Sequence, residues 1–141
     1  KQYSRLRGLS IVSLRYMAFG YGPWDQLGLA LLTRHLSGQD VARAVLIAAS
    51  KSDFVGDVIH IGPDTPLNNQ DIINALHDPK PVLEKYYPGA VTVLEQADVE
   101  ISSNYFWPAT SIRKAKRMLD WTPVDTFEKW LTEHGWDKPH A

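Results

Sequence analysis

A short apolar run that ends at an arginine, followed by a glycine-rich turn, most constrains what this chain can fold into. The run is Leu9 to Leu14 in GLSIVSLRYMAFGYGP (8–23), and its β-branched Ile11 and Val12 favour a buried strand. The glycines and the proline at positions 20–23 then end regular structure. We therefore expect the chain to be organised around one buried strand and the loop that follows it.

The residues after this strand are the first candidates for a binding site. In an open α/β sheet, the carboxyl ends of the strands border the crevice in which ligands bind. Here those residues are Arg15, Tyr16 and Met17. The alternative is a structural role, in which Arg15 pairs with a carboxylate or with carbonyl groups and the other two side chains pack.

Composition excludes several classes of function. The 141 residues include 15 Lys and Arg against 16 Asp and Glu, a net charge of -1, so we expect no affinity for nucleic acid or for a membrane surface. The absence of cysteine excludes disulfides and thiolate zinc sites. The sequence contains no apolar run of membrane-spanning length and no signal peptide, so we expect a cytoplasmic protein.

The order of the expected elements indicates an α/β or α+β fold. A second buried strand is expected at Asp57–Ile61, and residues 90–103 are left as strand or irregular structure. Helices are expected at 39–50, from Asn68 or Asn69 to 76, at 110–119 and at 127–134, with shorter ones at 27–32 and 82–86. Two strands make a poor sheet. We therefore expect that the rest of the sheet lies in another segment or in a partner.

Familiar catalytic signatures are missing from the sequence. It contains no GxGxxG or GxxGxxG dinucleotide fingerprint, no P-loop, no HExxH and no GxSxG. Its five histidines are scattered, without carboxylates at ligand spacing. The residues alone therefore predict neither a catalytic residue nor a metal site.

Four segments, in order, resemble a known family. SLRYMAFGYGP (13–23), LTRHLSGQDVARAVLIAAS (32–50), DVIHIGPDTPLNNQDI (57–72) and SIRKAKRMLDWTPVDTFEKWL (111–131) are similar to segments of the extended short-chain dehydrogenase/reductases, the NAD-dependent epimerase/dehydratase family. The resemblance covers nearly the whole chain. It implies that residues 1–141 form the C-terminal half of that fold. This half comprises the last strands of a Rossmann-type parallel sheet and a small α+β substrate-binding domain.

The resemblance also implies what this half does and what it lacks. In the family, the glycine-rich loop for NAD or NADP and the Tyr-x-x-x-Lys catalytic pair lie upstream of the first segment. The sequence starts at Lys1 within what resembles the end of a helix, so we expect it to be the later part of a longer protein. Arg15, Tyr16 and Met17 would then line the nicotinamide pocket, and the substrate wall would comprise Ala18, Arg34, His35 and Ser37.

Departures from the family pattern narrow the implied substrate. Ala18 stands where family members often carry Asn, and the stretch between Pro23 and Thr33 is short. The later segment LEQADVEISSN (94–104) is acidic, whereas a substrate diphosphate needs several charge-assisted contacts. The departures favour a sugar acid, a free sugar or another small hydroxy or carbonyl compound.

Two functions for the chain, and structural roles for several of its residues, remain open at this point. The chain is either the substrate-binding portion of an NAD(P)-dependent epimerase, dehydratase or dehydrogenase, or a non-catalytic module that binds a small molecule or a protein. Ser37 is equally a helix cap, and Asp40 is expected to bond loop backbone near the start of its helix. The aromatic run 105–107 belongs either to the core or to the wall of a pocket, and we favour the core. Partners are expected to be a small-molecule substrate and either a missing N-terminal half or a second copy paired along an open sheet edge.

Overall fold

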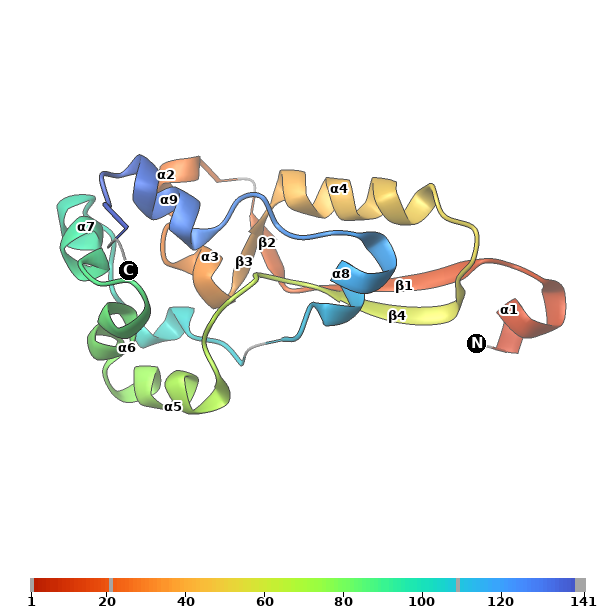
Figure 1. Cartoon of the computed structure of the whole chain (residues 1–141), viewed down its shortest axis with the longest axis horizontal. Coiled ribbons are helices and arrows are strands. Elements are labelled where there is room, and N and C mark those ends of the chain that lie inside the picture. The colour runs from red at the N-terminus through yellow and green to blue at the C-terminus, as the bar shows by residue number, and fades with distance from the viewer. Residues whose placement is uncertain (1, 21, 109, 139–141) are drawn as a thin grey trace.

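A computed structural model describes residues 2–20, 22–108 and 110–138. Its elements are labelled in Figure 1, with the strands before residue 62 and helices alone after it. They are α1 (Gln2–Arg7), β1 (Ile11–Tyr16), β2 (Ala18–Gly20), α2 (Trp24–Leu27), α3 (Ala30–Thr33), β3 (His35–Ser37), α4 (Gly38–Ala49), β4 (Val55–Ile61), α5 (Asn69–His77), α6 (Pro79–Tyr86), α7 (Ala90–Gln96), the 3-10 helix η1 (Ser103–Tyr105), α8 (Arg113–Leu119) and α9 (Phe127–Glu133).

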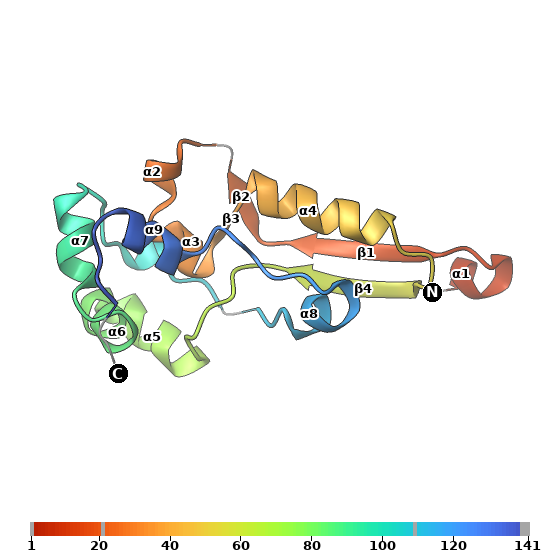
Figure 2. The same ribbon diagram turned by 45° about the horizontal axis from the view of Figure 1, so that its top comes forward.

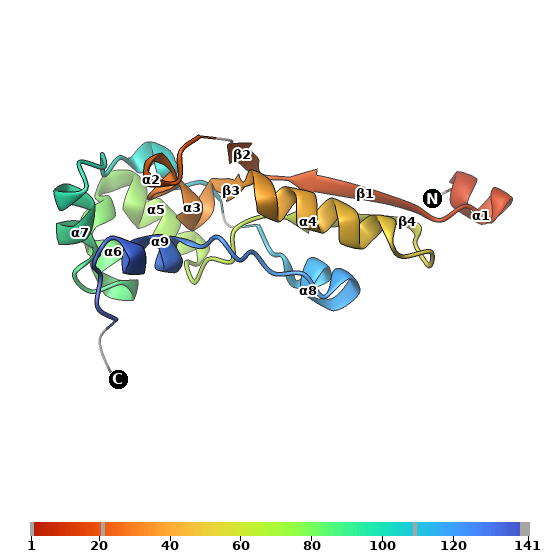
Figure 3. The same ribbon diagram turned by 90° about the horizontal axis from the view of Figure 1, so that it is seen from above.

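The two longest strands, β1 and β4, form a parallel pair. The register runs from Ile11 opposite Val55 to Tyr16 opposite Ile61. Helices α4 and α8 contact each other and lie on the same side of this pair (Figure 3), where Leu14 and Ile59 face them. The opposite face carries exposed side chains, including Arg15. Parallel sheets are normally covered on both faces, whereas among the described residues the helices cover one face of this pair.

The helices at the other end of the molecule enclose a separate hydrophobic core. Helices α2, α3, α5, α6, α7 and α9 gather there (Figure 2). Their apolar faces bury Trp130, Leu83 and Leu94 completely. No buried residue of this core belongs to the core between β4, α4 and α8. The described residues therefore form two lobes, each with its own core.

The strands β2 and β3 lie where the two lobes meet. They pair in parallel, with Ala18 opposite His35 and Gly20 opposite Ser37. β2 follows β1 after a single residue, and β3 leads directly into α4. This ribbon therefore joins the carboxyl end of the long strand pair to the helical lobe.

Caps that the sequence predicts define several helix ends. Ser37 caps α4 by accepting a hydrogen bond from the backbone N–H of Asp40, and Thr126 caps α9. Asn68 and Asp71 form a reciprocal capping box at the start of α5. Gly8, with φ of 64°, follows α1 as expected of a helix C-terminal glycine. The mixed α/β class with parallel strands is confirmed.

The structure corrects three of the expected elements. The first strand is Ile11–Tyr16 instead of 9–14, and it is half-exposed or exposed along its length because it is paired only with β4 among the described strands. Regular structure continues into β2 before the glycines end it. Residues 90–96 form helix α7, since its apolar residues pack against the helical core at helical spacing.

Two smaller features concern helices. The segment expected as one helix at 27–32 is divided into α2 and α3 by Gly28, whose φ of 36° breaks helical geometry. On α4, the apolar side chains Val45 and Leu46 are 44% and 70% exposed. The helix turns Ala44 and Ala48 toward the sheet instead, because these small side chains allow close packing.

Candidate functional site

The predicted cofactor residues lie at the carboxyl end of β1, and each side chain contacts a different part of the structure. Arg15 is exposed on the open face of the sheet, opposite His60 on β4. The Tyr16 ring makes an edge contact with Phe19 at 6.0 Å between centroids, and burial raises the pKa of its hydroxyl. Met17 packs against Gly62, and its sulfur accepts a hydrogen bond from Thr110 Oγ1 at 3.5 Å. Their contact with a cofactor stays a prediction.

The predicted substrate residues are brought together by the β2–β3 ribbon. Ala18 and His35 are direct neighbours across the two strands, and Arg34 immediately precedes β3. Ser37 lies at the other end of β3, where its hydroxyl oxygen accepts from the Asp40 backbone N–H at 3.2 Å. Its cap role is therefore confirmed, while its contact with a substrate stays a prediction.

Arg34 lies against two aromatic side chains, Tyr105 at the end of η1 and Trp107 two residues later. Its Cζ atom lies 4.9 Å from the ring centroid of Trp107 and 6.0 Å from that of Tyr105. Thr33 Oγ1 donates to the Tyr105 carbonyl at 2.5 Å and accepts from the Trp107 backbone N–H at 3.1 Å. These bonds fix the aromatic segment to the start of β3.

The structure divides the aromatic run that was assigned to the core. Phe106 is buried in the helical lobe, but Trp107 is 40% exposed and contributes its ring to Arg34. The sequence contained a signal for the exposure of Trp107, since the proline that follows it indicates the end of a regular element at the surface. The pairing with Arg34 bridges 73 positions of sequence, and no local pattern predicts such a contact.

His35 is a neutral side chain at this site. Burial lowers the pKa of its imidazole, and the positive charge of Arg34 lowers it further. A neutral imidazole at pH 7 can donate one hydrogen bond and accept another. The pair Arg34–His35 therefore offers one cation and one neutral polar group side by side.

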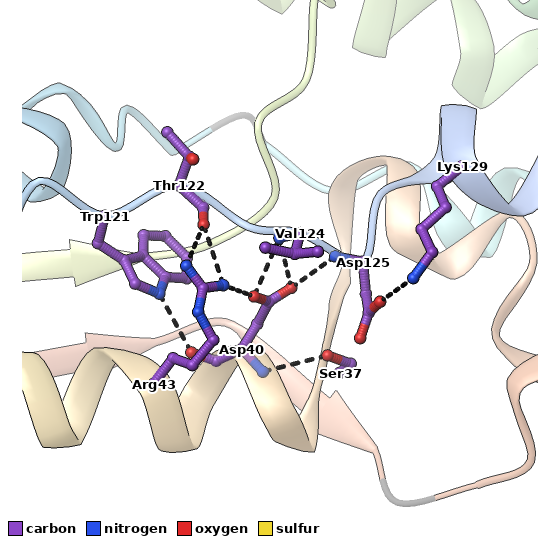
Figure 4. Close-up of polar contacts among 8 residues, drawn as sticks. All are labelled: Ser37, Asp40, Arg43, Trp121, Thr122, Val124, Asp125 and Lys129. Atoms are coloured by element: carbon purple, nitrogen blue, oxygen red, sulfur yellow. Dashed lines mark hydrogen bonds and ion pairs between the residues drawn. The ribbon is translucent and has the colours of Figure 1, made fainter.

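Asp40 joins the start of α4 to the segment before α9 (Figure 4). Its carboxylate is almost fully buried and accepts hydrogen bonds from the backbone N–H groups of Val124 and Asp125 and from the guanidinium of Arg43. The Trp121 indole N–H donates to its backbone carbonyl at 3.2 Å. The expectation that Asp40 bonds loop backbone is confirmed, and the loop is 122–125.

A cavity of about 590 Å³ opens beside this junction, at the carboxyl ends of β2 and β3. Its size is that of a small-molecule pocket. Lys129 forms part of its wall. The Lys129 Nζ atom lies 2.8 Å from the Asp125 carboxylate and 5.0 Å from the Trp24 ring centroid. The lining comprises Gly20, Gly22, Trp24, Leu27, Ser37, Gly38, Gln39, Ala42, Asp125, Lys129 and Glu133.

Two other kinds of site were searched for in the described residues. These residues contain no cluster of three or more histidine or carboxylate groups that could hold a metal ion. Among the described helices, none is both long and apolar enough to cross a membrane.

Comparison with solved structures identifies the fold. The chain is similar to the UDP-N-acetylglucosamine 4-epimerase from Bacillus cereus, with a TM-score of 0.51 and 21% identity over 94% of this chain and 45% of that one. It is also similar, at a TM-score of 0.49 and 17% identity, to MoeE5 in complex with UDP-glucose and NAD, over 90% of this chain and 46% of that one. No family model and no curated protein matches the sequence. The chain therefore has a fold found within the epimerase and spans less than half of that enzyme's length.

Proposed function

We propose that this chain is the substrate-binding portion of an NAD(P)-dependent epimerase, dehydratase or dehydrogenase of the extended short-chain dehydrogenase/reductase family. The observation that carries the proposal is the fold shared with UDP-N-acetylglucosamine 4-epimerase, which this chain matches over 94% of its residues. Four sequence segments that resemble the family, in the family's order, support it independently.

The long strand pair supports the idea that a nucleotide-binding half completes the sheet. Among the described strands, β1 is paired only with β4, so its other edge is open. A groove of about 600 Å³ runs beside that edge between β1 and α4, lined by apolar residues that include Ile11, Val45 and Phe54. An additional strand and its helix would bury this groove, as parallel sheets require.

The chain's own residues are not sufficient to hold a dinucleotide. The sequence has no glycine-rich loop to bring backbone N–H groups to a pyrophosphate, and no Tyr-x-x-x-Lys pair to move a proton. The role proposed for this chain is therefore to orient a substrate beside the carboxyl end of β1. Ala18, Arg34 and His35 would contact the substrate, and Tyr16 would border the nicotinamide.

The test is the sequence that precedes Lys1 in the gene and the behaviour of the joined polypeptide. We expect a GxxGxxG loop and a Tyr-x-x-x-Lys pair upstream, NAD or NADP binding in calorimetry of the joined chain, and no nucleotide binding and no turnover by residues 1–141 alone. A start codon directly before Lys1, with no nucleotide binding, would overturn the proposal in favour of a non-catalytic binding module. Turnover by the 141-residue chain would contradict the proposed division of roles.

A further inference from the structure

The guanidinium group of Arg34 is held in position by its neighbours, but one of its N–H groups has no hydrogen-bond acceptor. Its Nε atom is buried and has no hydrogen-bond partner among the described residues. None of the ion pairs in that part of the chain involves Arg34. A buried donor without an acceptor is unfavourable. Arg34 as a whole is half-buried, so the rest of its guanidinium group is within reach of a ligand that supplies an acceptor.

The surroundings of Arg34 hold it in place for such an acceptor. The Trp107 ring lies against the guanidinium, and the Trp107 indole N–H donates to the Asn104 carbonyl at 3.1 Å. Thr33 bonds the same segment at two points. Contact with the aromatic rings positions the guanidinium group, so that its terminal N–H groups can donate to an incoming anion.

We propose that Arg34, stacked on Trp107 and Tyr105, binds a carboxylate of the substrate, so that the substrate is an acidic sugar or a related small hydroxy acid. This inference rests on the proposed function, and it names the substrate class of that same site. A carboxylate matches the guanidinium in plane and can accept two parallel hydrogen bonds from it.

The charges near Arg34 favour one carboxylate over a diphosphate. Arg34 is the only Lys or Arg between Pro23 and Arg43, so the ribbon presents a single cation. The neighbouring His35 is held neutral, because its pKa is lowered by burial and by Arg34 itself. A neutral imidazole suits a substrate hydroxyl, whereas a second phosphate would need a second positive charge.

The experiment compares two sugars that differ only at C6. Indole signals of the 141-residue chain are followed by two-dimensional NMR during titration with D-glucuronate and, separately, with D-glucose. The Trp107 signal is assigned from its loss in Trp107→Phe. We expect glucuronate to shift the Trp107 signal and to bind about tenfold or more tightly than glucose, the effect of one charge-assisted contact.

Variants separate a specific contact from general charge. Arg34→Gln should abolish the preference for glucuronate, and Arg34→Lys should keep only part of it, because lysine lacks the planar fork. Arg113→Gln removes an exposed arginine of α8 and should change nothing. Equal binding of the two sugars, binding that survives Arg34→Gln, or no shift with either sugar would each overturn the carboxylate assignment. These titrations use no nucleotide, so their outcome does not depend on whether an upstream NAD-binding half exists.

Discussion

Both carboxylate oxygens of Asp40 lie 3.0 Å from the backbone nitrogen of Val124, 84 residues further along the chain. This contact places a charged acceptor at the start of α4 against a loop that has no regular structure of its own. The loop leads into α9, and its Asp125 holds Lys129 at the wall of the cavity. The geometry of the candidate pocket therefore depends on one buried carboxylate.

Replacing Asp40 should destabilise the chain more than its sequence position suggests. Asp40→Ala leaves the backbone N–H groups of Val124 and Asp125 without this acceptor and leaves Arg43 with the Thr122 carbonyl alone, so we expect a loss of about 3 kcal/mol in the free energy of unfolding. Asp40→Asn keeps one acceptor oxygen and should lose less. Urea denaturation measures both changes, with the exposed Asp53→Asn as the control. A loss for Asp40→Ala no larger than that of the control would refute the role of this contact.

Acid should weaken the helical lobe through Asp71. Hydrogen bonds from Lys85 and then Tyr86, with one from the Asn68 backbone, lower the pKa of this carboxyl to about 2. Since its folded pKa lies below the unfolded value of about 4, the contribution is present above pH 4 and is lost as the pH falls toward 2. Melting temperatures measured between pH 5 and pH 2, values chosen to span about this window, should fall less steeply in Asp71→Asn. Parallel curves for the two proteins would contradict this expectation.

Alkali should act on the same lobe through Tyr87. Burial, followed by the negative charges of Glu128 and Asp64, raises the pKa of its hydroxyl to about 12. The neutral form is thus favoured in the folded state, and its contribution is present below about pH 10 and lost as the pH rises toward 12. Tyr87→Phe should remove this loss while changing stability at neutral pH by less than about 1 kcal/mol. Stability curves from pH 8 upward, starting about two units below the tyrosine range, provide the measurement.

Gly62 and Met17 should behave as a coupled pair. A Cβ atom on residue 62 would lie 2.9 Å from Met17 Cγ, so Gly62→Ala must displace the methionine from the end of β1. We expect Gly62→Ala to cost about 1–3 kcal/mol, as overpacking does. Adding Met17→Ala should recover part of that cost, which a double-mutant cycle would measure. Additive losses would show that the two side chains do not share this space.

The open edge of β1 should promote self-association of the 141-residue chain. Ile11 lies in the strand that is paired only with β4 among the described strands, and it borders the apolar groove beside α4. A charged residue on an edge strand opposes pairing with another chain, so Ile11→Lys should lower the average mass in light scattering. Ile73→Lys, at an exposed position on α5, is the matched control. A monodisperse wild-type monomer would refute the prediction.

Local chemistry explains which parts of this fold were predictable from the sequence. The helices capped by Ser37, Asn68 and Thr126 begin where their polar caps indicate, because a cap acts within three or four residues. The parallel pairing of the two apolar strands agrees with the Rossmann-type parallel sheet that the family resemblance implied. Helix α7 was missed, because its valines favour strands in isolation and only packing against the helical core selects the helix.

The candidate site was predictable only in part. Ala18, Arg34 and His35 do come together, and the family resemblance had placed them on one wall. For Trp107 a pocket wall was only the alternative to the core, because its contact with Arg34 on a distant segment leaves no local sequence signal. The exposure of Ile11 was also unexpected, since an apolar strand predicts burial but not whether the burying residues belong to the same chain.

The separation of the two hydrophobic cores bears on how the chain loses its structure. Since no buried side chain is common to both cores, each can in principle melt alone, and only the segments passing between them make the loss concerted. Thermograms of the wild-type chain would then contain one peak. A chain in which those segments are loosened would give two peaks, and the order of the peaks would show which lobe has the higher melting temperature.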